Sequence, residues 1–114
     1  MKLKIEKNLK IINELIAYFN RLGNSNVHID LSNDADNSYF NIYGEVNSIS
    51  KDELESLIEI LNMPRQHEIE QYYWTLNGES EFDSELTLVG MMVNNAKVSY
   101  EGGILKISLI RSEH

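Results

Sequence analysis

Apolar residues recur at helical spacing in the N-terminal part of the chain. Residues 4–22 carry a stripe on one face with Lys, Glu and Asn opposite, made of Ile5, Leu9, Ile12, Ile16 and Phe19. This pattern predicts an amphipathic helix, and Gly23 then accepts the left-handed conformation in which helices commonly end. Because three lysines would lie at the positive end of the helix dipole, a later start is the alternative, with residues 2–5 extended.

A period of two follows and predicts a β-hairpin. Two segments alternate apolar with polar residues, as half-buried strands do: Val27, Ile29 and Leu31 in the first, and Phe40, Ile42 and Val46 in the second. Between them, residues 32–38 are rich in Asn, Asp and Ser, whose short side chains bond nearby backbone groups in turns. Tyr39 and Tyr43 fall on the polar face of the second strand, so they form an exposed aromatic patch or are covered by a helix or a second subunit.

Two short helices are predicted in the middle of the chain. Ser50 to Glu53 forms a capping box, in which the serine accepts from the third N–H and the glutamate reaches back. Behind it, apolar residues recur at helical spacing: Leu54, Leu57, Ile58 and Leu61. Pro64 cannot continue this helix but suits the first turn of another. The next helix would bury Ile69, Tyr72, Tyr73 and Leu76 and end at Asn77-Gly78.

The C-terminal third predicts three strands. Leu86–Val93 is apolar on both faces, as a central strand is, and residues 97–101 and 105–109 alternate. Asn94-Asn95 and Gly102-Gly103 are pairs that accept positive φ in two-residue hairpin turns, so these strands would be antiparallel.

The predicted order is therefore α-β-β-α-α-β-β-β. It corresponds to an α+β two-layer sandwich with about five mainly antiparallel strands and helices packed on one face. The length of 114 residues leaves room for a single domain over residues 1–114.

Composition narrows the class of protein. A chain that is 42% hydrophobic and 25% charged has the balance of a globular protein rather than a disordered one. The chain contains no cysteine, which excludes disulfides, thiolate metal sites and cysteine nucleophiles. No apolar run resembles a signal peptide or reaches the roughly 18 residues that a membrane helix needs. We therefore expect a soluble cytoplasmic protein that does not cross a membrane.

Charge is unevenly distributed along the chain. The net charge is −8, and residues 45–85 carry eleven acidic side chains against Lys51 and Arg65. This field would repel nucleic acid. A basic partner protein, a cation or simple solubility remain as explanations of the acidic segment.

The clearest docking candidates lie in and beside this segment. Four carboxylates alternate and would share one side of an extended chain, about 6–7 Å apart: Glu79, Glu81, Asp83 and Glu85. Trp74 follows two tyrosines, and since each helical step rotates by about 100°, it would point outward, as interface anchors do. A solvated acidic loop and a tryptophan at the rim of the core are the ordinary alternatives.

Two metal-binding patterns are incomplete. His67 and Glu70 share a helix face and could offer half a transition-metal site, although acidic residues in a first turn also suit the helix dipole. Counting from Asp34, acidic and hydroxyl residues fall at the ligand positions of a calcium-binding loop. Tyr39 stands where that loop needs glycine, so a polar hairpin turn is the better interpretation.

These patterns favour a non-enzymatic protein–protein interaction or regulatory module without a cofactor. Its docking surface would combine Trp74 and the carboxylates of residues 79–85 with Tyr39 and Tyr43, and its partner would be another protein or a second copy of the chain. The alternative is a metal-dependent enzyme or small-ligand binder that uses His67, Glu70 and the same carboxylates.

Overall fold

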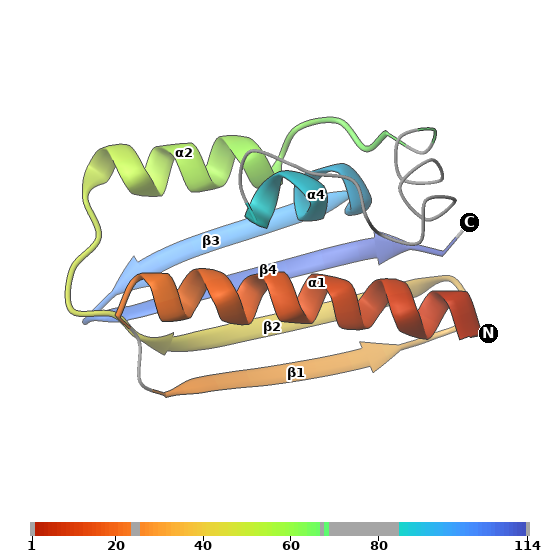
Figure 1. The fold of residues 1–114 in the computed structure, drawn as a ribbon, viewed down its shortest axis with the longest axis horizontal. Coiled ribbons are helices and arrows are strands. Elements are labelled where there is room, and N and C mark those ends of the chain that lie inside the picture. Colours follow the sequence, from red (N-terminus) through yellow and green to blue (C-terminus); the bar gives the residue numbers. More distant parts are fainter. Residues whose placement is uncertain (1, 24–25, 67, 69–84, 114) are drawn as a thin grey trace.

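The computed structural model describes residues 2–23, 26–66, 68 and 85–113, and this part of the chain forms three helices and four strands (Figure 1). In chain order they are α1 (Lys2–Arg21), β1 (Val27–Asn33), β2 (Asn37–Glu45), α2 (Lys51–Leu61), α4 (Glu85–Met92), β3 (Asn95–Glu101) and β4 (Ile104–Ser112). The strands form one antiparallel sheet in the order β1-β2-β4-β3. None of the described helices is long and apolar enough to cross a membrane.

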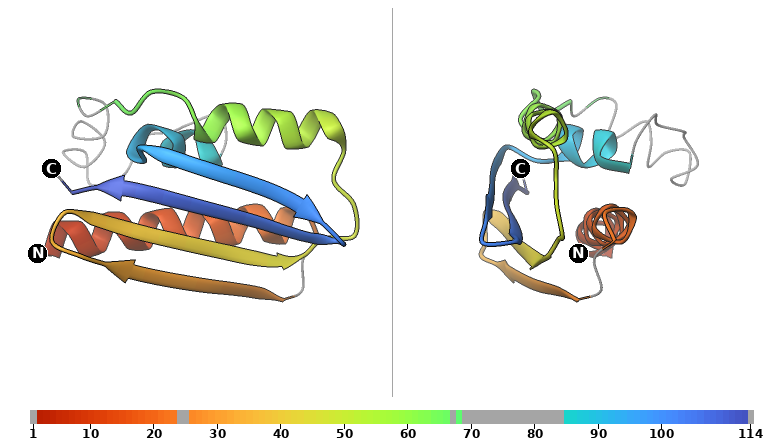
Figure 2. Two further views of the ribbon diagram at one scale, coloured as in Figure 1. Left: turned by 180° about the vertical axis from the view of Figure 1, so that it is seen from behind. Right: turned by 90° about the vertical axis from the view of Figure 1, so that its left-hand side faces the viewer.

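The helices all cover the same face of the sheet (Figure 2). The core lies between the two layers, and alternate residues of the central strands supply its floor: Phe40, Ile42 and Val46 from β2, and Leu105, Ile107 and Leu109 from β4. Ile11, Leu15 and Phe19 of α1 pack onto this floor. The predicted α+β architecture with an antiparallel sheet is confirmed, but the described sheet has four strands instead of about five.

The missing strand is the segment Leu86–Val93, which was predicted as a central strand and forms the helix α4 instead. Leu86, Leu88, Val89 and Met92 are all buried, because α4 packs against α1, α2 and the sheet at once. A helix enclosed on every side is apolar all round, and an apolar run of this kind has no period that separates it from a buried strand. The second predicted central helix, Ile69–Leu76, lies outside the described residues.

Both ends of α1 can be compared with the prediction. The helix is continuous from Lys2, so the alternative with residues 2–5 extended is wrong. Lysines in a first turn oppose the helix dipole by only about 0.3–1 kcal/mol each at an exposed surface, which the packing of Ile11, Leu15 and Phe19 outweighs. The buried face of α1 is thus rotated from the predicted stripe, whose Ile5 and Leu9 are exposed. At the other end, Gly23 has a φ of +83°, as predicted for the residue that ends the helix.

Of the two predicted two-residue hairpin turns, one is confirmed and one is wrong. Gly102-Gly103 joins β3 to β4 with φ angles of +57° and +79°, and Glu101 pairs directly with Ile104, as in the predicted two-residue hairpin. Asn94-Asn95 is not a hairpin turn, because it connects α4 to β3. The Asn94 side chain accepts hydrogen bonds from Arg65 at 2.9 Å and from the Ser112 N–H at 2.7 Å.

The capping box before α2 forms only in part. The Ser50 hydroxyl accepts the Glu53 N–H at 3.0 Å, as predicted. The Glu53 carboxylate accepts a hydrogen bond from the Tyr18 hydroxyl at 2.8 Å and lies 3.8 Å from the Arg21 guanidinium. The glutamate therefore joins α2 to α1.

A glycine sets the distance between α2 and α4. A Cβ atom added at Gly90 would lie 2.1 Å from the Ile60 carbonyl oxygen, so only glycine allows this approach.

We expect Gly90→Ala to lower the free energy of unfolding by about 1–3 kcal/mol, because the two helices must move apart. Denaturant unfolding measures the loss. Ser56→Ala, on the exposed part of α2, should change stability by less than about 0.5 kcal/mol, and equal stability of both variants would contradict the close packing.

Candidate interaction surface

The face of the sheet opposite the helices is open to solvent among the described elements (Figure 2). Side chains alternate across the strands, so the residues of β2 between the buried ones project from this face. Strand register arranges them in rows: Ser32, Tyr39, Ile110 and Asn95; Asp30, Asn41, Ser108 and Lys97; and His28, Tyr43, Lys106 and Ser99. We call this set the open face. Tyr39 and Tyr43, predicted on the polar face of their strand, both belong to it.

Tyr43 is the largest side chain that the open face exposes substantially. Its ring stacks on His28 of β1 with centroids 4.9 Å apart and an interplanar angle of 11°. Tyr43 nevertheless keeps 41% of its surface exposed. Stacking limits the motion of both rings, so an aromatic surface is presented in a nearly fixed orientation. Such side chains lose little conformational entropy when a partner covers them.

Two exposed isoleucines of β4 extend the apolar part of the open face. Ile110 is the direct cross-strand neighbour of Tyr39, and Ile104 lies diagonally from Tyr43. Between these two apolar patches lies a polar row in which the Ser108 hydroxyl donates to the Asn41 side chain at 2.6 Å. The open face thus alternates apolar and hydrogen-bonding strips.

Charges on the open face are mixed. Lys106 projects from the central strand β4 and Lys97 from the edge strand β3, whereas Asp30, Glu45 and Glu101 lie toward the other margins. This arrangement differs from the strongly acidic average of the chain. It suits a partner surface with acidic or polar groups at its centre and basic groups around it.

Asp34 organises the turn beside the open face. Its Oδ1 accepts the N–H groups of Asn37 at 2.7 Å and Asp36 at 2.8 Å, and its Oδ2 accepts the Tyr39 hydroxyl at 2.8 Å. These donors stabilise the carboxylate and lower the pKa of Asp34. The same bond raises the pKa of the Tyr39 hydroxyl. The loop therefore uses its acidic side chain to hold a hairpin turn, in agreement with the prediction.

A buried polar cluster was not predicted. It joins the first half of α1, the end of β1, the start of β2 and the end of β4, and consists of Asn8, Ser38, Arg111 and Glu113 with the exposed Asn33 at its edge. The Ser38 hydroxyl lies within hydrogen-bond distance of Asn8 at 3.1 Å, Asn33 at 2.7 Å and the Glu113 carboxylate. Arg111 donates to the Met92 carbonyl at 2.7 Å, and its Nε lies 3.6 Å from Glu113.

This cluster has a structural role. Ser38 is fully buried, and Asn8 and Arg111 are each 3% exposed, so a substrate has no access to the hydroxyl. The sequence held a signal for it. Arg111 has the same parity as Leu105, Ile107 and Leu109, and Ser38 has the parity of Phe40, which places both on the buried face.

The other predicted site residues are not brought together by the described structure. Trp74, Glu79, Glu81, Asp83, His67 and Glu70 lie outside the described residues. Glu85 is the first residue of α4 instead of the end of a loop. Within residues 2–23, 26–66, 68 and 85–113, no three His, Asp or Glu side chains are placed to hold a metal ion.

Comparison with known proteins gives no assignment. No protein-family model matches the chain, and no curated protein matches it.

The Asp34 contacts predict a pH-dependent turn. Because its pKa is lower in the folded than in the unfolded chain, Asp34 stabilises the fold above the ordinary aspartate pKa, and this contribution is lost as the pH falls through the lowered value. We expect Tyr39→Phe to move the Asp34 pKa back toward that of a free aspartate, measured by NMR titration of the side-chain carboxyl carbon. Tyr43→Phe removes a hydroxyl that is not among the groups lowering this pKa, so it should leave the titration unchanged. An identical Asp34 pKa in wild type and Tyr39→Phe would contradict the hydrogen bond.

The buried cluster predicts a stability change at the penultimate residue of the chain. Glu113→Ala leaves the buried Arg111 charge without its carboxylate, so we expect the free energy of unfolding to fall by about 2–4 kcal/mol. Chemical denaturation gives the value. Glu101→Ala removes an exposed carboxylate from β3 and should cost less than about 0.5 kcal/mol. A similar small effect at both positions would show that the cluster does not contribute to stability.

Proposed function

We propose that the chain is a non-enzymatic protein-binding module whose docking surface is the open face of its sheet. The observation that carries this proposal is the exposed Tyr43 ring, held by stacking on His28 and lying diagonally from the exposed Ile104 of β4. Aromatic side chains of this kind are over-represented among the residues that dominate binding energy at protein interfaces.

The hydrogen-bonding strip supports the same function. Asn41, Ser108 and Lys97 offer polar groups between the two apolar patches, and an interface typically combines an apolar centre with hydrogen bonds and a polar rim. Asp30, Glu45 and Glu101 supply such a rim. Their carboxylates would attract a partner that presents basic side chains around an apolar centre.

In this proposal the acidic segment of residues 79–85 attracts the partner by its charge, and Trp74 adds an aromatic contact. Four carboxylates within that segment add to the attraction for a basic partner, so association should be faster at low ionic strength. The open face then supplies the contacts that hold the partner in place. The protein itself would act by occupying the surface to which it binds.

The proposal is tested by comparing captured proteins, because the partner is identified only by its chemistry. The immobilised chain and its Tyr43→Ala variant are incubated with native lysate of the source cells, and bound proteins are quantified by mass spectrometry. Loss of a central aromatic residue commonly costs 2 kcal/mol or more, about a thirtyfold loss of affinity. We therefore expect at least one protein to be retained by the wild type and depleted with the variant.

The matched control is Glu55→Ala, which changes an exposed side chain of α2 on the helix layer. It should retain the same protein as the wild type. Circular dichroism of both variants confirms that the fold is retained. The proposal is wrong if the wild type and both variants capture the same proteins in the same amounts.

A further inference from the structure

Strand β1 is an edge of the sheet that no described element covers. It pairs on one side with β2, and Figure 1 shows no helix or strand of the described residues beyond its other side. Proteins usually protect such edges with lysine, proline, a bulge or a short strand. β1 has seven residues, pairs with β2 in one unbroken register, and contains neither lysine nor proline. It therefore has the features of a strand that pairs with another strand.

The direction in which the N–H and C=O groups of β1 point follows from the hydrogen bonds between β2 and β4. At its two ends, the Glu113 N–H donates to Asp36 and the Val46 N–H donates to Gly103, so the even-numbered residues of β2 bond β4. Bonding residues of a strand alternate between its two neighbours, and the odd-numbered residues of β2 therefore bond β1. Their partners in β1 are even-numbered. The N–H and C=O groups of Val27, Ile29 and Leu31 consequently point outward.

The side chains of these three residues lie on the helix side of the sheet, but only Val27 is partly covered. Ile29 is 39% and Leu31 37% exposed, although their alternation predicted half-buried positions. The reason is the position of α1, which lies over the central strands and leaves β1 uncovered at the margin (Figure 2). An apolar strip thus runs along the open edge.

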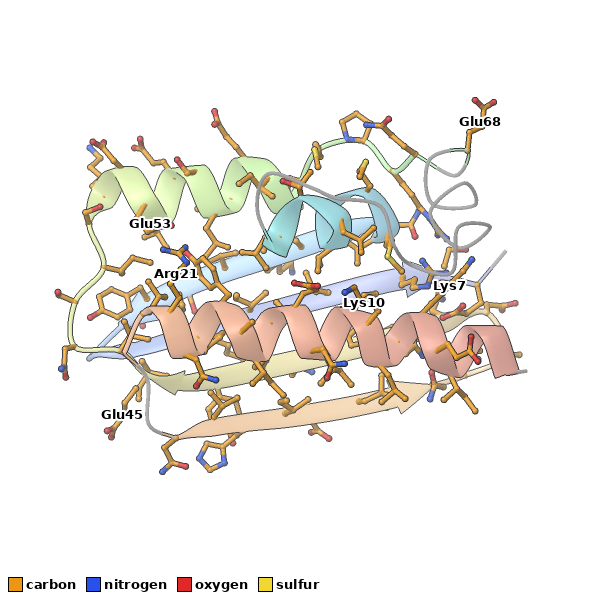
Figure 3. The ribbon with its side chains drawn as sticks, in the orientation of Figure 1. Lys7, Lys10, Arg21, Glu45, Glu53 and Glu68 are labelled. Carbon is orange, nitrogen blue, oxygen red and sulfur yellow. The ribbon has the colours of Figure 1, made fainter. Side chains whose placement is uncertain are left out.

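Helix α1 adds to this strip. Lys7, Lys10 and Arg21 project from its flank toward α2 and α4 (Figure 3). A rotation of about 100° per residue places a second apolar stripe on the opposite flank, beside β1: Ile5, Leu9, Ile12 and Ile16. Ile5 is 58% and Leu9 51% exposed. The edge of β1 and this flank of α1 form one continuous apolar margin.

We propose that a second copy of the chain occupies this margin through antiparallel pairing of β1 with β1, about a two-fold axis at Ile29. In this register Ile29 faces Ile29 of the second copy, and Val27 faces Leu31 in both directions. All three pairs use outward-pointing N–H and C=O groups, which gives six backbone hydrogen bonds. His28 and Asp30 face each other twice on the open face, in positions where side chains are closest.

Charge selects this register among the alternatives. Outward-pointing groups must face one another, so the axis can lie at residue 28, 29, 30 or 31. An axis at Leu31 sets Asp30 opposite Ser32 and Ile29 opposite Asn33, which gives neither residue a complementary neighbour. An axis at Asp30 sets two carboxylates directly opposite each other, which is destabilising. An axis at His28 sets two imidazoles opposite each other and moves Leu31 beyond the partner strand's first residue. Only the axis at Ile29 gives every charged or apolar residue from Val27 to Leu31 a complementary neighbour.

The same axis relates the exposed flanks of α1. Because α1 runs antiparallel to β1 (Figure 1), the rotation sets the two copies of α1 antiparallel above the junction of the strands. The Ile5–Leu9 end of one helix then faces the Ile12–Ile16 end of the other. The apolar side chains that are exposed in one copy become the second layer of the interface.

This inference does not depend on the proposed function. The dimer uses the edge of β1 and the flank of α1, with His28 and Asp30 at the β1 margin of the open face, whereas the proposed partner binds the open face over β2 and β4. Pairing of β1 would join the two open faces into one sheet of eight strands, with a Tyr43 ring on each side of the axis. Ile110→Ala changes the open face on β4, which β2 separates from β1, and should leave the dimer intact, so the two proposals can fail separately.

Single-cysteine variants test the register, because the natural chain has no cysteine. Residues in a hydrogen-bonded antiparallel pair have Cα atoms about 5.5 Å apart, within the range that a disulfide spans. Ile29→Cys should therefore cross-link to a covalent dimer under mild oxidation, as seen by non-reducing electrophoresis. Leu31→Cys has a similar exposure, but its two copies would lie about 13 Å apart along the strands. It should remain uncross-linked at the same protein concentration.

Charge reversal tests the pairing in the native state by sedimentation equilibrium. His28→Glu places a carboxylate opposite Asp30 of the other copy, and this happens twice because of the two-fold axis. The repulsion should weaken dimerisation by about tenfold. Adding Asp30→Lys to that variant restores opposite charges and should recover the wild-type dissociation constant. A merely structural effect of the first substitution would not be reversed by the second.

Three results would overturn the proposal. The first is a monomeric mass for the pure wild type at concentrations up to about 1 mM, where even weak specific pairs associate. The second is cross-linking of Leu31→Cys as readily as Ile29→Cys, which would show a different interface. The third is a dimer whose dissociation constant is unchanged by His28→Glu.

Discussion

The structure depends on the ladder between β2 and β4. Nine residue pairs join a strand from the first half of the chain to the strand at its C-terminal end, and both strands are then paired on their two sides. This ladder brings together the alternating apolar residues onto which α1 and α4 pack. It also fixes the open face, since the rows of side chains on that face follow from the same register, and it carries Glu113 to the buried Ser38.

Periodicity in the sequence was sufficient for elements that have one exposed side. The helical period of α1, the alternation of β2 and the glycine pair before β4 each have a local physical cause, and each was predicted correctly. The buried face of α1 was not: Ile11 and Leu15 are buried, whereas Ile5 and Leu9 of the predicted stripe are exposed. Leu86–Val93 failed because α4 is enclosed by two helices and the sheet, so that no polar face marks its period. Within this segment, Gly90 permits a close approach of α4 to the backbone of α2.

The alternation of side chains along each strand predicted which residues share a face of the sheet, but it did not predict which parts of a face are covered by helices. It placed Tyr39 and Tyr43 with the polar residues of β2, where the structure has them, and would also have placed Ser38 and Arg111 in the core. It could not show that Ile29 and Leu31 are exposed, because this depends on the sideways position of α1 over the sheet. Such a position is set by packing between distant elements and leaves no pattern within β1 itself.

The long connection between β2 and β4 has a consequence for synthesis of the protein. The ribosome completes β1 and β2 as a local hairpin, but the inner edge of β2 has no partner until residues 104–112 have emerged. At about 5–20 residues per second, the chain between Glu45 and Ile104 takes several seconds to make. During that time the inner edge of β2 is unpaired, and for most of it α4, which joins Phe40 and Ile42 in the core, has not been completed. Among the described elements, β4 is translated last and completes the core.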